Sequence, residues 1–286
     1  YLKLAMKERV LITGANGFVG RRLFQALSID NEYEVSNLDR NKYSFGQVEL
    51  LKKVIKGNNA IIHLAALRAG NQVDLTRANV ESTKGLLQAI SSNETPTLLI
   101  FASSFAVYAV QSDILCEDTE TKPRNAYGES KLMAESLIRD FISQTENSAL
   151  ILRFSTIYGP DSHSVVSGIC ESVKHGGRLN INYDGSQEVD LLYIDDAISA
   201  IKKCLQWKGN SGQVEIINIC SGCPVSINKI VQIVEQIAGK SLEKNYNRQV
   251  SADGYWIGDH SKAKKLLKWK PTIDLKESIK TTYEST

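Results

Sequence analysis

GANGFVG, residues 14–20, stands between the apolar run RVLIT and the segment RRLFQAL, whose apolar residues recur at helical spacing. The order is therefore strand, tight turn, helix. Gly14 allows the turn, Gly17 leaves no side chain where a pyrophosphate would approach, and Gly20 lets the helix pack closely on the strand. The free N–H groups at the start of the helix attract phosphate. The stretch predicts a dinucleotide-binding turn, and a P-loop is excluded because no Gly-Lys-Ser/Thr follows.

An acidic residue follows at the distance that this turn requires. Asp39 ends the next apolar segment, nineteen positions after Gly20, where a carboxylate binds the ribose 2′-hydroxyl of a dinucleotide. Because its charge would repel the 2′-phosphate of NADP, we expect NAD as the cofactor. Arg40 could offset that repulsion, which keeps NADP as the alternative. Otherwise Arg40 is a solvated surface residue.

Segments typical of strands and helices alternate through the first half of the chain. This alternation predicts an α/β fold, a Rossmann-type doubly wound parallel sheet with helices on both faces. The near-continuous apolar runs LLIFAS and LILRF are typical of strands buried on both faces. The expected elements, strand and helix in turn, are residues 9–13, 17–29, 33–39, 47–57, 59–66, 75–91, 97–104, 126–143 and 149–159.

The pattern loosens after residue 160, and residues 161–188 show little periodicity. Helices are expected again over 195–207 and 227–239, a strand over 214–220, and a helical, turn-rich tail. We therefore expect an NAD(P)-binding domain over residues 6–160 and a smaller, mixed α/β C-terminal region over 161–286 that mostly binds the substrate. Segments from about 190 to 220 are expected to return to the first domain.

Composition places the chain among ordinary globular proteins. It has 286 residues, 42% of them hydrophobic and 23% charged, with a net charge of +2. That charge favours neither nucleic acid nor an acidic membrane as a partner. No apolar run is long enough to span a bilayer, and the opening YLKLAMKERVLIT lacks the apolar core of a signal peptide. Met6 is a candidate native start, and we expect a cytoplasmic protein.

The cysteines predict reduced thiols. There are 5 of them, an odd number scattered along the chain, which is more typical of a reducing compartment than of a disulfide framework. Cys220 and Cys223 form a C-x-x-C, but no second pair and no neighbouring histidine accompanies them. A lone pair of this kind is weak support for zinc, and we expect no metal.

A second group of residues has the pattern of acid/base chemistry. YGESK places Tyr127 and Lys131 four apart on one face of an expected helix. A nearby ammonium favours the phenolate and lowers the pKa of the phenol, which would let Tyr127 exchange protons near neutral pH. Ser103 and Ser104 end a strand, where ligands bind in doubly wound sheets. Alone, the Tyr–Lys spacing could equally mark a surface tyrosine beside a solvated lysine.

Seven motifs together resemble a known family. TGANGFVG, HLAA, RANVESTKGLL, SSFAVY, YGESK, LRFSTIYGP and YIDDAISAI occur in the order found in extended short-chain dehydrogenases/reductases. The chain is most similar to the NAD-dependent epimerase/dehydratase group, which acts on nucleotide-sugars. The tail DHSKAKKLLKWKP is also typical of that group, so the resemblance runs from Met6 to Pro271.

The resemblance implies roles for individual residues. Tyr127 would be the general base, Lys131 would hold the nicotinamide ribose and tune the tyrosine, and Ser104 would polarise the reacting oxygen. Asn79 would support the site, unless it only caps a helix start, and His63 is expected to be an ordinary packed strand residue. The implied cofactor-binding residues are Gly14, Gly17, Phe18, Val19, Gly20, Asp39, Arg40, Leu64, Ala65, Ala66, Asn79, Ser103, Tyr127 and Lys131.

Departures from the family pattern narrow the reaction. Dehydratases of the group carry an Asp-Glu pair directly after the catalytic Ser or Thr, and here those positions are Phe105 and Ala106. Neither side chain transfers protons, so we expect no dehydration. The expected activity is a nucleotide-sugar epimerase with hydride and proton transfer at C4 of the hexose. The alternatives are a 4-keto-sugar reductase and, in another class, a non-catalytic NAD(P)-binding regulator, which intact Ser104, Tyr127 and Lys131 disfavour.

The substrate side departs from the family pattern as well. Thr156 stands at the usual place of an Asn, and Val189 at that of a phosphate-binding Arg. The stretch between Asp39 and Ala60 is shorter than in typical epimerases, which leaves the adenine contact unassigned. The family also implies a homodimer formed by the helices that carry Asn79 and Tyr127. The implied substrate-binding residues, for a nucleoside-diphosphate sugar, are Arg68, Ser104, Phe105, Thr156 and Arg248.

Overall fold

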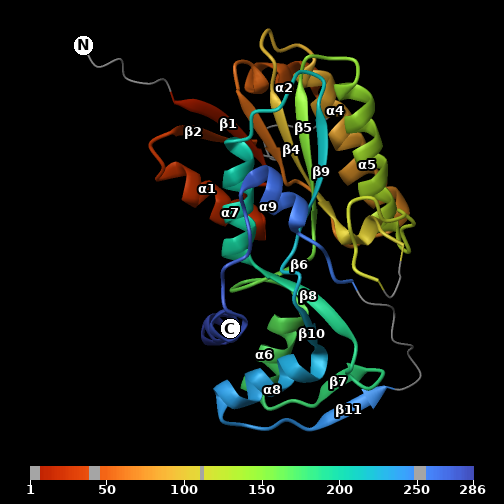
Figure 1. Cartoon of the computed structure of the whole chain (residues 1–286), viewed down its shortest axis with the longest axis vertical. Helices are drawn as coiled ribbons and strands as arrows, with labels where there is room; N and C mark the ends of the chain where they lie inside the picture. Colours follow the sequence, from red (N-terminus) through yellow and green to blue (C-terminus); the bar gives the residue numbers. More distant parts are fainter. Residues whose placement is uncertain (1–6, 39–45, 110–112, 248–255) are drawn as a thin grey trace. The chain divides into compact units, whose positions relative to one another are not determined.

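The computed structural model describes residues 7–38, 46–109, 113–247 and 256–286 (Figure 1). The chain forms two compact units. The first comprises Tyr1–Tyr108, Thr121–Arg153 and Ile201–Ile217, and the second comprises Ala109–Glu120, Phe154–Ala200 and Asn218–Thr286. The first unit therefore takes in a late segment of the chain. Asp39, Arg40 and Arg248, three of the predicted site residues, lie outside the described residues.

The first unit is built on a sheet with strand order β2-β1-β3-β4-β5-β9. Its strands are β1 (Glu8–Thr13), β2 (Tyr33–Leu38), β3 (Ala60–His63), β4 (Leu98–Ser104), β5 (Ser148–Phe154) and β9 (Val214–Ile219). β1 pairs in parallel with both β2 and β3, and β3 pairs in parallel with β4. The chain thus leaves β1 on one side and returns on the other. A doubly wound sheet binds its ligand where the order reverses in this way, which here is between β1 and β3.

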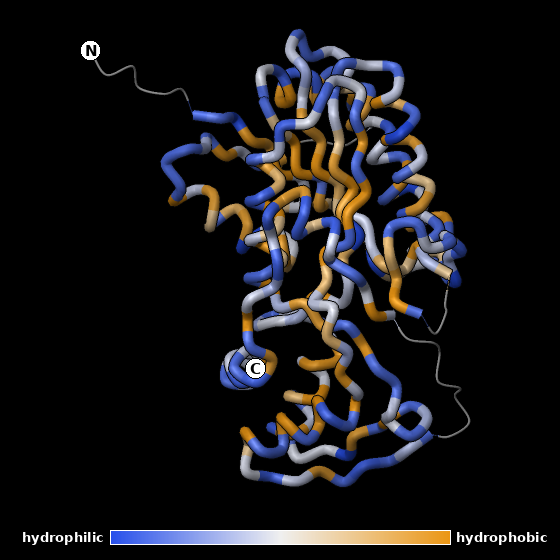
Figure 2. The backbone as a smooth tube through the Cα atoms, viewed as in Figure 1, coloured by the Kyte–Doolittle hydropathy of each residue, from blue (hydrophilic) through white to orange (hydrophobic). Residues whose placement is uncertain are grey.

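Burial explains why these segments form strands. Val10, Leu11 and Ile12 are all fully buried although alternate residues of a strand face opposite sides, so both faces of the sheet are covered. Hydrophobic residues run along the central strands in Figure 2. On one face, Leu11, Ile61, Leu99 and Ile151 join a core cluster with residues of three helices. These helices are α2 (Val48–Ile55), α4 (Ser82–Ile90) and α5 (Ala126–Ile142).

The helix predicted over residues 75–91 is not uniform. The chain forms α3 (Gln72–Leu75), then a π-helical turn, η1 (Thr76–Glu81), and then α4. Asn71 caps the start, where its side chain accepts from the backbone N–H of Asp74 at 2.9 Å. Single π-turns inside helices are found disproportionately at functional sites. Asn79 lies within η1 and is not the cap of a helix start.

The second unit contains two small sheets in its described residues. β8 (Glu188–Tyr193) pairs antiparallel with β10 (Pro224–Ser226) and parallel with β6 (Thr156–Tyr158), while β7 (Leu179–Asn182) pairs with β11 (Lys244–Asn247). The single strand expected over 149–159 is divided, since Ser155 separates β5 from β6. The unit's helices are α6 (Val165–His175), α7 (Ile194–Leu205), of which the last residues belong to the first unit, α8 (Ile227–Ala238), α9 (Ser261–Leu267) and α10 (Leu275–Ser285).

Residues 161–188, where the sequence shows little periodicity and no element was predicted, contain helix α6 and strand β7. Helix α6 has local start and stop signals. The Ser164 side chain accepts from the N–H of Ser167, and Gly176 ends the helix in the left-handed conformation at φ 70°. None of the described helices is both long enough and apolar enough to cross a membrane.

Candidate active site

The glycine turn brings the loop after β1 against the loop after β3. Gly14 has φ +75°, and a Cβ there would lie 2.7 Å from the backbone N of Ala65. A Cβ on Gly20 would lie 2.1 Å from the Gly14 carbonyl oxygen. Only glycine permits both approaches. Helix α1 (Phe18–Ser28) then begins with no side-chain cap and no acidic residue in its first turn, which leaves a helix N-terminus suited to a phosphate.

A hydrogen-bond network holds Leu67 in the loop after β3, which comprises residues 64–71. The Asn79 side chain accepts from the backbone N–H of Leu67 at 2.7 Å and donates to its carbonyl oxygen at 2.9 Å. It also donates to the Ser130 hydroxyl at 2.9 Å, and Ser130 donates to the Tyr127 carbonyl oxygen at 2.8 Å. Asn79 therefore ties the loop to the first turn of α5, and its amide group is largely engaged by protein partners.

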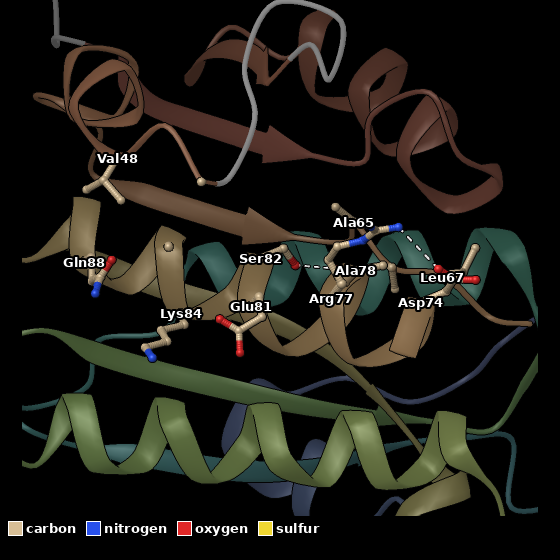
Figure 3. A pocket seen from close by; sticks show the side chains of 13 residues that line it. Val48, Ala65, Leu67, Asp74, Arg77, Ala78, Glu81, Ser82, Lys84 and Gln88 are labelled. Carbon is tan, nitrogen blue, oxygen red and sulfur yellow. Dashed lines mark hydrogen bonds and ion pairs between the residues drawn. The ribbon is translucent and has the colours of Figure 1, made fainter. Parts of the chain in front are cut away.

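A cavity of about 760 Å³ opens beside this loop (Figure 3). Arg77 reaches Asp74 with an N–O distance of 3.2 Å, so part of its charge is already compensated. Neither composition nor motif spacing predicted this cavity. The one signal was the stretch between Asp39 and Ala60, whose shortness left the adenine contact unassigned. Its lining consists of the start of α2, the loop after β3 and one side of the α3–η1–α4 rod, namely Gly46, Val48, Ala65, Ala66, Leu67, Asp74, Arg77, Ala78, Glu81, Ser82, Lys84, Gly85 and Gln88.

Close packing of α5 on the end of β4 places Tyr127 and Lys131. The helix is capped by Asn125, whose side chain accepts from the N–H of Gly128 at 2.8 Å. A Cβ on Gly128 would lie 2.1 Å from the carbonyl oxygen of Ala106, in the short 3₁₀ helix η2 (Phe105–Val107) that follows Ser104. Ser104 itself caps η2, where its hydroxyl oxygen accepts from the N–H of Ala106 at 3.2 Å. Glycine at position 128 thus lets helix α5 approach the end of strand β4, where Ser104 lies.

Lys131 does not bond to the Tyr127 hydroxyl in this arrangement. Its ammonium donates to the Ala102 carbonyl oxygen at 2.7 Å, and it lies 4.7 Å from the Phe101 ring centroid and 5.9 Å from that of Tyr127. Burial lowers the pKa of Lys131 to about 7, and the Glu135 carboxylate opposes that shift. The buried lysine is therefore poised between its two charge states.

The electrostatics of Tyr127 differ from the expectation. Burial raises the pKa of Tyr127, while the Arg68 charge and a hydrogen bond with Ser104 lower it. The sequence predicted that Lys131 would lower this pKa, but in the structure Arg68 and Ser104 exert that influence instead. Arg68 is an exposed residue of the loop after β3, so the loop contributes a cation to the tyrosine.

His63 packs in β3 as a buried polar residue. Its Nδ1 lies 2.6 Å from the Thr13 hydroxyl and its Nε2 lies 3.1 Å from that of Thr83. Because Thr83 donates its own proton to the Asn79 carbonyl oxygen at 2.7 Å, it accepts from His63, and the ring carries its proton on Nε2. Burial, aided by the Lys131 charge, lowers the pKa of His63 to about 3, which keeps the ring neutral.

Two predicted contacts do not fit the observed placement. Phe105 is only 2% exposed and packs edge-on against Tyr108 with ring centroids 5.6 Å apart, so it leaves little surface for a substrate. Ser103 is also buried, and its hydroxyl donates to the Glu135 carboxylate at 2.5 Å, which commits the proton that would face a cofactor. Alternation along β4 turns Ser103 and Ser104 to opposite faces. Thr156 is an exposed residue of β6 in the second unit.

A buried ion pair, which no sequence motif indicated, lies next to Ser103. Glu135 and Arg153 are joined by an N–O distance of 2.7 Å and are almost completely buried. Glu135 follows Lys131 by one helical turn on the same face of α5. The spacing Tyr127, Lys131, Glu135 was visible in the sequence, but the partner on β5 was not.

Comparison with known proteins gives consistent results. Residues 10–220 match the model of the NAD dependent epimerase/dehydratase family. The UDP-glucuronate 4-epimerase of Thermodesulfobacterium geofontis is 31% identical, over 95% of this chain and 94% of that protein. An uncharacterized UDP-glucose epimerase of Bacillus subtilis is 27% identical, over 95% of both chains. The crystal structure of UDP-glucuronic acid 4-epimerase from Bacillus cereus, in complex with UDP-glucuronic acid and NAD, superposes with a TM-score of 0.86 at 28% identity, covering 97% of this chain and 98% of that one.

Proposed function

The chain belongs to the NAD dependent epimerase/dehydratase family, and we propose that it is an NAD-dependent epimerase that inverts C4 of a nucleotide-linked hexose. The proposal depends mainly on one observation. Within the first unit, Tyr127 and Lys131 of α5 lie next to Ser104 at the end of β4. The related T. geofontis protein is a UDP-glucuronate 4-epimerase, and the B. cereus structure holds both UDP-glucuronic acid and NAD.

The residues around the glycine turn fit NAD. Backbone atoms at Gly14 and Gly20 leave no room for side chains, and the uncapped start of α1 offers its N–H groups to a pyrophosphate. Ala65 and Ala66 line the cavity beside the turn, which we assign to the adenosine half of the cofactor. Asp39 is proposed to bind the adenosine ribose. When bound, NAD would accept a hydride from C4 of the sugar and return it to the other face.

The chain's own residues would move the proton. Tyr127 takes the proton of the C4 hydroxyl as the hydride leaves and gives it back afterwards. Arg68 and Ser104 both favour the phenolate that this step needs. With a sugar bound, the Ser104 hydroxyl would turn its single proton from Tyr127 to the C4 oxygen and polarise it. Lys131, as an ammonium, holds a hydroxyl of the nicotinamide ribose.

Dehydration is disfavoured on chemical grounds. The two positions after Ser104 are Phe105 and Ala106, both buried in η2. Neither can remove or supply the protons that loss of water from the sugar requires. The site can therefore oxidise and reduce C4, which is the chemistry shared by a 4-epimerase and a 4-ketoreductase.

A nucleoside diphosphate is the proposed handle on the substrate. Arg248 is the proposed clamp for the diphosphate, with a charged fork matched to phosphate oxygens, and Arg68 and Thr156 are further candidates. Val189 lies in β8, and the family pattern to which the sequence was compared has a phosphate-binding arginine at this place. With one anchor replaced by hydrocarbon, we expect modest substrate affinity.

We also propose a homodimer in the cytoplasm. Helices α4 and α5 lie side by side on the first unit (Figure 1), and Met133 of α5 is 48% exposed. These are the helices that would pair across the dimer. All five cysteines are free, which suits a reducing compartment. Light scattering after gel filtration measures the mass, and a monomer at micromolar concentration would contradict the dimer.

The function is tested by a panel of UDP-, dTDP- and GDP-hexoses incubated with the enzyme and NAD, with nicotinamide absorbance recorded throughout. Formation of the C4 epimer without net change in absorbance supports the epimerase. Stoichiometric consumption of reduced cofactor with a 4-keto sugar identifies the ketoreductase instead. Tight NAD binding with no turnover of any sugar would support a cofactor-binding regulator.

A further inference from the structure

A buried ion pair lies directly behind the proposed catalytic residues. Glu135 is 0% exposed and the Arg153 side chain is 3% exposed. Arg153 donates from Nε to Oε1 at 3.0 Å and from Nη2 to Oε2 at 2.7 Å, a two-pronged contact. The Arg153 guanidinium also lies 4.7 Å from the Tyr108 ring centroid. A buried ion pair often contributes no more stability than hydrophobic side chains of the same size. Stability alone therefore does not explain why this pair lies next to the proposed catalytic residues.

Hydrogen bonds connect Glu135 and its neighbour Lys131 to the end of β4. On α5, Lys131 donates to the Ala102 carbonyl oxygen at 2.7 Å, and Glu135, one turn later, accepts from the Ser103 hydroxyl at 2.5 Å. Two successive residues of β4 are thus held by two successive turns of the helix. Ser104 comes next in the strand. Its position relative to Tyr127 is therefore determined in part by Glu135.

Glu135 also determines the charge that surrounds Lys131. From β4, Lys131 meets the Phe101 ring and the Ala102 carbonyl oxygen, neither of which titrates. From β3 it faces His63, whose pKa is lowered to about 3 and whose ring is neutral at physiological pH.

On its own helix Lys131 faces the Tyr127 ring at 5.9 Å and the Glu135 carboxylate, which opposes the effect of burial on the lysine. Arg68 acts on Tyr127 from the loop after β3, and Arg153 reaches the group from β5 through Glu135. Glu135 is the source of negative charge in this set.

We propose that Glu135, held by Arg153, is a positioning residue that fixes the end of β4 through Ser103 and keeps Lys131 protonated, and so sets the pH range in which the enzyme works. The predicted effect on the pH range of activity rests on the proposed epimerase function. The predicted effect of Glu135 on the charge state of Lys131 does not depend on any substrate. If Lys131 loses its proton, the positive charge proposed to hold a hydroxyl of the nicotinamide ribose is lost.

The test follows the titration of Lys131 by ¹³C NMR in full-length protein labelled with [ε-¹³C]lysine, the signal being assigned by its loss in Lys131→Arg. Glu135→Gln removes the carboxylate that balances the buried Arg153 charge and can prevent folding, so the double variant E135Q/R153Q, which buries no net charge, is measured beside it. In the double variant we expect the pKa of Lys131 to fall by about one unit or more. Glu135→Asp retains the charge and should leave the pKa nearly unchanged.

Two further variants separate the mechanical role from the electrostatic one. Ser103→Ala removes the hydroxyl that Glu135 holds but keeps the charge, so kcat should fall while the Lys131 titration stays as in the wild type. Glu129→Gln removes an exposed carboxylate from the same helix and serves as the matched control with no change in either quantity. The alkaline limb of the pH profile of kcat/KM should move to lower pH in E135Q/R153Q and not in E135D.

A Lys131 titration in E135Q/R153Q within about 0.3 units of the wild type, against the shift of one unit or more that a lost partner charge produces, would overturn the proposal. An equal shift in Glu129→Gln would do so too, since the effect would then not belong to Glu135. The NMR titration needs no substrate. A failure of the epimerase function would appear as wild-type protein that turns over no sugar, whatever Lys131 does.

Discussion

At the scale of single residues, Tyr127 has to overcome its own burial. Burial raises its pKa, and the two influences that lower it come from different parts of the chain, Arg68 in the loop after β3 and Ser104 at the end of β4. Lys131 sits one helical turn away but directs its ammonium to the Ala102 carbonyl oxygen. Sequence spacing could place the tyrosine and the lysine on one face. It could not show which cation acts on the phenol, because that depends on where each side chain ends.

The first prediction concerns Tyr127→Phe, which keeps the ring and removes only the oxygen that exchanges the proton. We expect turnover to fall roughly a hundredfold or more, while NAD binding changes little. Steady-state kinetics beside a fluorescence titration with NAD measure the two quantities separately. Turnover within about threefold of the wild type would show that another group moves the proton.

The second prediction uses His63, whose pKa is lowered from 6.5 to about 3 by burial. Between these pH values His63 is protonated in the unfolded chain but neutral in the folded protein. The free energy of unfolding therefore falls as the pH falls through this range. The contribution is up to about 1.4 kcal/mol per pH unit. In His63→Gln it disappears, so the difference in unfolding free energy between variant and wild type should narrow from pH 7 to pH 4. Urea unfolding at several pH values tests this, and two parallel stability curves would contradict it.

At the scale of elements, the approach of α5 to η2 depends on one missing side chain. A Cβ on Gly128 would lie 2.1 Å from the Ala106 carbonyl oxygen, so any larger residue forces α5 away from the strand that carries Ser104. Overpacking of this kind in a rigid backbone contact destabilises a protein by roughly 1–3 kcal/mol. The site should suffer more than the fold, since Tyr127 is the neighbouring residue.

The third prediction therefore compares Gly128→Ala with Gly168→Ala. Gly168 lies inside α6, and a Cβ there meets nothing within 4 Å, so alanine should be neutral or stabilising by up to about 1 kcal/mol. Gly128→Ala should lower both the melting temperature and kcat. Thermal unfolding and steady-state kinetics of both variants decide it, and equal behaviour of the two would show that the close approach at Gly128 is not required.

Elements also show where sequence reasoning succeeds and where it stops. Strands β1, β3 and β4 and helix α5 were predicted because the pattern of apolar residues in each segment agrees with its burial in the fold. The π-helical turn around Asn79 was not, because Asn79, Leu67 and Ser130 are brought together only by the fold. Helix α6 was not predicted, although Ser164 and Gly176 mark its ends, because residues 161–188 show little periodicity.

At the scale of the whole molecule, the parallel Rossmann-type sheet and the family were predictable from the order of motifs along the chain. The three proposed catalytic residues were found in the same way. The Glu135–Arg153 pair and the cavity beside Ala65 were not, since their residues come from separate elements and no single motif contains them. To predict such buried contacts, one must know the register of the sheet and the rotation of each helix about its axis. A sequence pattern determines neither.

In the proposed reaction, one site removes a hydride from C4 of a nucleotide-linked hexose and returns it to the opposite face. The most direct measurement uses a hexose conjugate, accepted in the substrate panel, that carries deuterium at C4, incubated with the wild-type enzyme and NAD in ordinary water. For the proposed epimerase, we expect both epimers at equilibrium to retain deuterium at C4 and the nicotinamide absorbance to show no net change. Exchange of the deuterium with solvent, or its stoichiometric accumulation on released cofactor, would contradict it.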